Sequence, residues 1–131
     1  MAEIIPGLKG RAEKTVNETN TAKTMGSGLL DVFATPALVA MMEEAAVNAL
    51  ELGEGQSSVG VSLDIKHVAA TPIGIKVWAL AELIEVDRRR LVFKVEAFDE
   101  KELIGSGIHE RFLIDADKFM AKTQMKLSGQ E

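Results

Sequence analysis

Hydrophobic residues form their longest run between positions 37 and 50, where only three polar residues interrupt it. Thr35 and Pro36 precede this run as a helix start, with Thr35 as the N-cap and Pro36 as the first helical residue. Gly53 then marks the end of the helix. Because the run is apolar on nearly all sides, we predict a helix that a sheet wraps on most of its sides.

The pattern changes to an alternation of period two after Gly55, which is typical of half-buried strands. The apolar members of the first such run are Val59, Val61, Leu63 and Ile65. Three further runs cover residues 75–86, 91–98 and 103–114, with short charged turns between the last two pairs. We predict that these four strands form an antiparallel meander.

The remaining segments complete the predicted order of elements. Residues 11–22 are rich in Thr, which predicts a strand. We predict a short helical turn over residues 29–33 and a helix in the tail from about Asp117. One apolar helix with an antiparallel sheet of about five strands around it is an α+β architecture, and it has the shape of the hotdog fold. With no linker or internal repeat, we expect one domain over residues 1–131, with 1–10 and 126–131 loosely ordered.

Composition narrows the classes of function. The chain has 131 residues and a formal net charge of −5, which argues against nucleic acid as its main partner. It has no Cys and two His, so thiolate chemistry is excluded and we expect no metal site. No apolar run approaches a membrane span, and the first residues do not resemble a secretory signal. We therefore expect a cytoplasmic domain. Because a domain of this size buries only a modest core, we also expect it to pair with a second copy.

Glu43 is an unusual residue in the apolar helix. Glu44 shares a narrow polar stripe with Asn48 and Glu51, whereas the helical neighbours of Glu43 three and four positions away are all apolar. A carboxylate in these surroundings is either desolvated or specifically paired, and desolvation makes it a better proton acceptor. The alternative is a Glu at the border of the helix that reaches solvent.

His67 continues the alternation of the preceding apolar positions and so lies at the end of the apolar face of its strand. It is either a core His bonded to a backbone carbonyl or a partner of Glu43 in proton transfer. Thr35 also has two interpretations. Besides capping the helix, it lies where a helix N-terminus offers positive potential to a carbonyl oxygen or a carboxylate.

The last strand carries His109, Glu110 and Arg111 after Gly105-Ser106-Gly107. Arg111 shares a face with His109, and Glu110 points the other way. Arg111 either joins a cross-strand ion pair or holds an anionic or carbonyl group of a ligand. The glycines of this strand, and Gly60 in the first strand of the meander, indicate close backbone approach or a bulge.

Several motifs together resemble one known family. They are Val32-Phe33-Ala34-Thr35 with Met42-Glu43, Leu52-Gly53-Glu54-Gly55, His67-Val68-Ala69-Ala70-Thr71-Pro72-Ile73-Gly74, Arg89-Arg90-Leu91, Gly105-Ser106-Gly107-Ile108-His109-Glu110-Arg111 and Lys118-Phe119-Met120-Ala121-Lys122. Over roughly residues 11–125 the chain resembles hotdog-fold acyl-CoA thioesterases of the fluoroacetyl-CoA thioesterase type. The His-x-Ala-Ala-Thr-Pro and Gly-Ser-Gly-x-His-Glu-Arg runs carry this resemblance in combination.

The resemblance implies a set of site residues and an assembly. It implies Thr35, Glu43 and His67 as catalytic residues, and Gly60 and Arg111 as substrate-binding residues. It also implies a homodimer with the active site at the subunit interface, where the helix of one protomer faces the sheet of the other. The segment 25–30 departs from the family because it lacks the aromatic residues that form a lid over the acyl group, so fluoroacetyl selectivity is not carried over.

We therefore expect hydrolysis of a small acyl-CoA or related thioester, with CoA as part of the substrate and no separate cofactor. Glu43 would attack the carbonyl or activate water, and His67 would transfer protons. The sequence is compatible with either role of Glu43, with different acyl groups and with either CoA or a carrier protein as the thiol. It is also compatible with dimers that pair into tetramers. The alternatives are a non-catalytic hotdog module that binds a small ligand and a hotdog hydratase that acts on an enoyl thioester.

Overall fold

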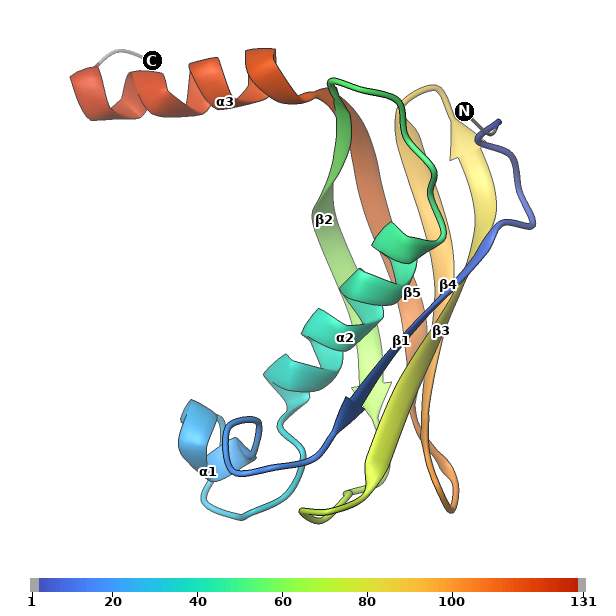
Figure 1. Cartoon of the computed structure of the whole chain (residues 1–131), viewed down its shortest axis with the longest axis vertical. Coiled ribbons are helices and arrows are strands. Elements are labelled where there is room, and N and C mark those ends of the chain that lie inside the picture. Colours follow the sequence, from blue (N-terminus) through green and yellow to red (C-terminus); the bar gives the residue numbers. More distant parts are fainter. Residues whose placement is uncertain (1–2, 130–131) are drawn as a thin grey trace.

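The structure is a computed structural model that describes residues 3–129 (Figure 1). The described chain forms β1 (Lys9–Thr15), α1 (Ala22–Met25), α2 (Thr35–Asn48), β2 (Gln56–His67), β3 (Lys76–Asp87), β4 (Arg90–Asp99), β5 (Leu103–Asp115), α3 (Ala116–Gln124) and the 3-10 helix η1 (Met125–Ser128). The predicted α+β class with a five-stranded antiparallel sheet is confirmed. The outermost residues of the predicted loose ends, 1–2 and 130–131, lie outside the described residues.

The sheet has the order β1-β3-β4-β5-β2, and all its pairs are antiparallel. Strands β3, β4 and β5 form the predicted meander, but β2 pairs with β5 rather than with β3. The connection between β2, at one edge of the sheet, and β3 therefore crosses to the other side of the sheet. On this connection the Thr71 carbonyl accepts from the Phe33 N–H at 2.9 Å. Turn residues show where a strand ends but not which strand it pairs with, which explains the difference from the predicted order.

Helix α2 lies across one face of the curved sheet (Figure 1). Its residues against the sheet are fully buried, namely Leu38, Met41, Met42, Ala45 and Ala46. Its outer side is open, because Ala40 is exposed and Val47 is 46% exposed. The prediction that the sheet wraps most of the helix is therefore wrong for the single chain, since the sheet covers only one side.

A β-bulge in β2 changes which residues face the helix. The register with β5 shifts between Gly60 and Ser62, so that Val61 is an extra residue. Val59 consequently pairs with Phe112 and faces away from α2, whereas Leu63 lies opposite His109 on the helix side. The predicted common face for these apolar residues is wrong at Val59, because one inserted residue reverses the alternation.

The N-terminal part differs locally from the prediction. Strand β1 ends at Thr15, because the Asn17 side chain accepts from the Thr19 N–H and hydroxyl and turns the chain. Residues 29–33 form no helical turn; Val32 and Phe33 instead make isolated bridges to Pro72 and Thr21. The predicted C-terminal helix is confirmed as α3, which projects away from the sheet (Figure 1). Among residues 3–129 no helix is long and apolar enough to span a membrane.

Candidate active site

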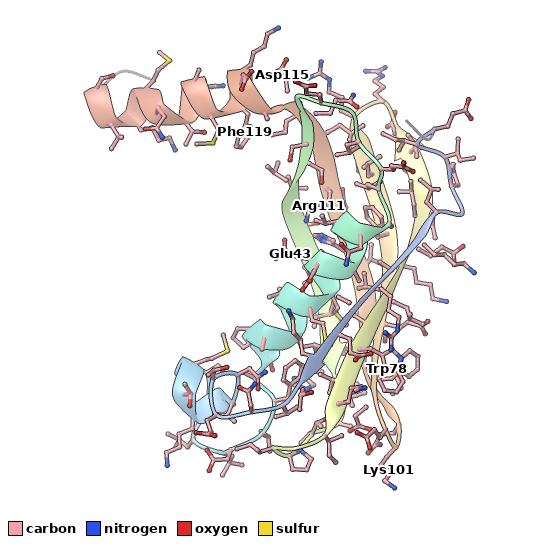
Figure 2. All side chains as sticks on the ribbon, in the orientation of Figure 1. Glu43, Trp78, Lys101, Arg111, Asp115 and Phe119 are labelled. Carbon is pink, nitrogen blue, oxygen red and sulfur yellow. The ribbon has the colours of Figure 1, made fainter. Side chains whose placement is uncertain are left out.

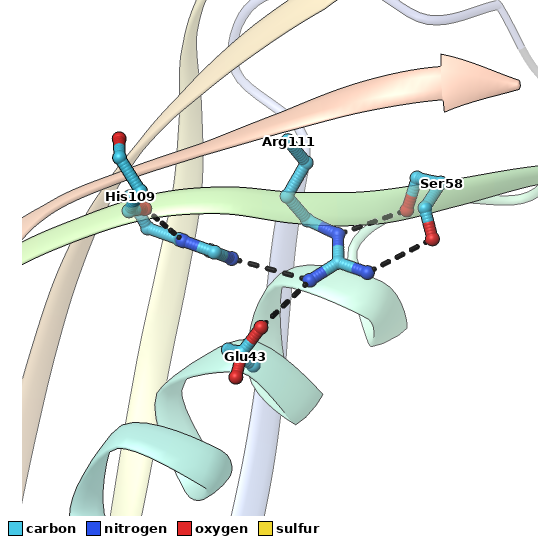
Figure 3. A network of polar contacts seen from close by, with 5 residues as sticks. Glu43, Ser58, His109 and Arg111 are labelled. Carbon is cyan, nitrogen blue, oxygen red and sulfur yellow. Dashed lines mark hydrogen bonds and ion pairs between the residues drawn. The ribbon is translucent and has the colours of Figure 1, made fainter. Parts of the chain in front are cut away.

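Arg111 is the centre of a polar cluster between α2 and the paired strands β2 and β5 (Figures 2 and 3). The residue is only 6% exposed. Its Nε donates to Ser58 Oγ at 2.9 Å and its Nη2 to the Ser58 carbonyl at 3.0 Å. Its Nη1 donates to Glu43 Oε2 at 3.4 Å. Ser58 therefore holds the guanidinium through two hydrogen bonds, and Nη1 faces the Glu43 carboxylate.

His109 also belongs to this cluster, although the sequence identified it only as a neighbour of Arg111 on the same face. Its Nδ1 lies 2.8 Å from the Ser62 carbonyl, and its Nε2 lies 3.2 Å from Arg111 Nη1. A carbonyl only accepts and a guanidinium only donates, so Nδ1 carries the proton and the ring is neutral. Burial is the main cause that lowers the pKa of His109, and the charge of Arg111 adds to it.

Glu43 is paired rather than desolvated in the single chain. Its side chain is 42% exposed and lies against Arg111, whose side chain is 7% exposed. Glu44 points outward to Lys14, with 3.1 Å between carboxylate and ammonium, so the predicted difference between the two adjacent glutamates is confirmed. Burial lowers the pKa of Arg111 and Glu43 opposes this shift. The cluster thus places an accessible carboxylate beside a buried cation.

Gly60 lies directly under the Glu43 carboxylate. A Cβ at this position would lie 2.4 Å from Glu43 Oε2 and 3.3 Å from Arg111 Nη1. The close approach predicted for Gly60 is confirmed, and it exists because the bulge at Val61 turns Gly60 toward α2. Any side chain here would displace the carboxylate.

Thr35 and His67 form a second, separate pair. The Thr35 hydroxyl lies 2.8 Å from His67 Nδ1. The predicted N-cap role of Thr35 is wrong, because Ala34 is the N-cap and Thr35 is the first residue of α2. The pair lines an open depression of about 280 Å³ with Phe33 and Ser27. Burial lowers the pKa of His67, although the backbone of Ala69 opposes it.

The two clusters do not meet within one chain. Thr35 and Glu43 are eight residues apart in α2, which is about 12 Å of helix. Between residues 3 and 129 no hydrogen bond joins Glu43 to Thr35 or His67. The structure thus brings Glu43, Gly60 and Arg111 together, and Thr35 and His67 together, at two places along the same helix.

Comparison with known proteins places this arrangement in a family. Residues 16–117 match the family described as fluoroacetyl-CoA-specific thioesterase. A fluoroacetyl-CoA thioesterase of Streptantibioticus cattleyicolor is 45% identical over 98 residues, which cover 73% of this chain and 70% of that protein. The chain belongs to the fluoroacetyl-CoA-specific thioesterase family.

Solved structures of this thioesterase family and its fold relatives agree with the architecture. A structure of the fluoroacetyl-CoA thioesterase FlK has a TM-score of 0.89 at 35% identity and covers 95% of this chain and 98% of its own. A thioesterase-superfamily protein of Thermus thermophilus has a TM-score of 0.88 at 26% identity, with 98% and 96% covered. A hot-dog-like protein of Thermanaerovibrio acidaminovorans has a TM-score of 0.83 at 25% identity, with 92% and 91% covered. The predicted hotdog fold is therefore confirmed.

The segment before α2 passes beside the Thr35–His67 depression, to which Ser27 contributes. Leu29 is 89% exposed and Leu30 is 68% exposed.

In the part of the chain that the structure describes, no three His, Asp or Glu side chains are grouped as metal ligands would be.

Proposed function

We propose that this chain hydrolyses a small acyl-CoA thioester to the free acid and the thiol, with Glu43 as the group that attacks the carbonyl or activates water. The observation that carries the proposal is the Glu43 carboxylate itself, which Arg111 orients above Gly60 while 42% of the side chain stays accessible. A thioester carbonyl is already activated, so an oriented carboxylate, a proton donor and a group that stabilises the oxyanion suffice for hydrolysis.

The two other catalytic residues and the N-terminal end of α2 would handle the proton and the oxyanion. Thr35 hydrogen bonds to His67 Nδ1 and so orients the ring, which leaves His67 Nε2 for proton transfer. When the C–S bond breaks, His67 would supply the proton that the thiolate takes up. With the proton on Nε2, Nδ1 accepts the Thr35 hydroxyl proton, so the positive N-terminal end of α2 would stabilise the carbonyl oxygen as it becomes negative. CoA enters as part of the substrate, and these groups perform every step.

We propose that the complete site forms in a homodimer. The separation of about 12 Å along α2 between Thr35 and Glu43 supports this, because the two clusters would then combine across the interface. The outer side of α2, with Val47, and the free edge of β2 supply surface for a second copy. The helix of one protomer would face the sheet of the other, so that Glu43 of one meets His67 of the other. Light scattering should give twice the chain mass of 14.2 kDa.

Mixing two inactive variants tests the shared site. Glu43→Gln and His67→Ala should each be inactive alone, whereas co-refolded mixtures should regain activity. Each mixed dimer would contain one site with both residues intact. Mixtures that stay inactive, although differently tagged copies of the two variants co-purify as a mixed dimer, would contradict a site built from two protomers.

The activity itself is tested with a panel of short acyl-CoAs and a disulfide reagent that detects free thiol. We expect turnover of small acyl groups, since the depression beside His67 holds about 280 Å³. The segment 25–30, in which Leu29 and Leu30 are exposed, lacks the aromatic residues of the family's lid, so the proposal does not extend to selectivity for fluoroacetyl. Thermal stabilisation by acyl-CoA without any turnover would instead identify a binding module. We place this activity in the cytoplasm, where acyl-CoA is available.

A further inference from the structure

Helix α3 begins directly after β5, and one of its faces carries a cluster of positive charge next to an aromatic ring. Lys122 follows Lys118 by four residues and Phe119 by three, so the three side chains lie on one side of the helix. With Arg89 and Ile114 they line an open depression of about 360 Å³. We call these five residues the α3 cluster. Figure 2 shows Phe119 on the underside of α3, close to its junction with β5 at Asp115.

The positive charge of the α3 cluster is not used within the chain. Among the described residues, no ion pair includes Arg89, Lys118 or Lys122. The cations that do form ion pairs are Arg11, Lys14, Lys76, Arg90 and Arg111. One carboxylate, that of Asp115, lines the depression, but it accepts the backbone N–H of Lys118 as the cap of α3. Three unpaired cations around one depression are unusual in a chain with a net charge of −5.

We propose that the α3 cluster binds the phosphorylated adenosine end of CoA, an inference that rests on the proposed thioesterase function. The Arg89 guanidinium and two ammonium groups suit phosphate oxygens. The Phe119 ring, 39% exposed, offers a face on which a base can stack. The combination of ring and cations matches a nucleoside phosphate better than it matches either an apolar ligand or a simple anion.

The position of the α3 cluster relative to the proposed catalytic residues fits a long substrate. Arg111 and Asp115 lie on the same strand, four residues or about 13 Å apart. The pantetheine arm of CoA would span from the α3 cluster to the thioester. A carrier protein would also be attracted by positive charge, but a concave depression with a ring in it suits a nucleotide rather than a protein surface.

The experiment compares two substrates in two variants. Lys118→Ala/Lys122→Ala should raise KM for the acyl-CoA by about tenfold or more and leave kcat nearly unchanged. The same variant should hydrolyse the matching acyl-pantetheine, which lacks the nucleotide, as the unaltered chain does. Lys101→Ala is the matched control, because Lys101 is exposed at the opposite end of the sheet (Figure 2). It should leave both substrates unaffected.

Binding of adenosine 3′,5′-bisphosphate, measured by calorimetry, separates this proposal from the proposed activity. We expect the unaltered chain to bind it and the double Lys variant to lose about tenfold in affinity, whether or not any thioester is hydrolysed. Equal KM values for acyl-CoA in all variants, or equal affinity for the bisphosphate, would overturn the proposal. It would also be overturned if the double variant lost turnover only with an acyl-carrier protein.

Discussion

Glu43 and Glu44 are adjacent, chemically identical and similarly exposed, so they form a natural matched pair for substitution. Their side chains are 42% and 47% exposed, and each faces one cation, Arg111 at 3.4 Å and Lys14 at 3.1 Å. Changing either to Gln keeps the shape and removes one charge. The substitutions therefore differ only in which cluster loses the carboxylate.

The structure sets an upper limit on the change in stability. An ion pair with a partly exposed carboxylate contributes about 0–1 kcal/mol. Glu43→Gln belongs at the upper end, since Arg111 is buried, although the Gln carbonyl can still accept from it. Both variants should thus unfold within a few degrees of the unaltered chain.

Activity should separate the two variants. Loss of the attacking or activating carboxylate costs at least about 10²-fold in rate, or about 2.7 kcal/mol of transition-state stabilisation. That exceeds the largest stability change expected, so kcat of Glu43→Gln should fall while Glu44→Gln keeps nearly full turnover. The assay is thiol release from a short acyl-CoA, with thermal melts on the same samples. Equal losses in both variants, or full activity in Glu43→Gln, would refute the reasoning.

Three further predictions follow from the same contacts. Arg111→Ala should raise KM, and Arg111→Lys should not restore it because the bonds of Nε and Nη2 to Ser58 are lost; an unchanged KM would contradict this. Gly60→Ala should lose activity with little change in melting temperature, since its Cβ meets the end of a flexible side chain, whereas Gly107→Ala should destabilise strongly because its Cβ would lie 2.1 Å from a backbone oxygen. Burial lowers the pKa of His67 and of His109 from the ordinary value of 6.5, so as the pH falls these residues bind protons in the unfolded chain before they do so in the folded chain. The free energy of unfolding should therefore decrease as the pH drops below about 6.5. Thermal melts between about pH 7.5 and 5.5 check this, and a constant melting temperature would count against it.

The candidate site residues come from two kinds of signal in the sequence, local pattern and family motif. Helical phase alone separated Glu43 from Glu44, and the family motif added Thr35 and Gly60, which local pattern marked only weakly. His109 was not selected, although its position two residues before Arg111 on the same strand face was the available signal. Its role depends on the Ser62 carbonyl, which is 47 residues away in the sequence.

Local periodicity determined the helix, most of the strands and the face on which Glu43 lies, because 3.6-residue and two-residue repeats are properties of contiguous residues. Tertiary structure alone decided that β2 pairs with β5, that Val61 bulges and that Thr35 contacts His67. These features depend on contacts between residues far apart in the chain, whose packing free energies no local repeat encodes. The bulge is the clearest case, since a single inserted residue turned Gly60 toward the Glu43 carboxylate and Val59 away from it.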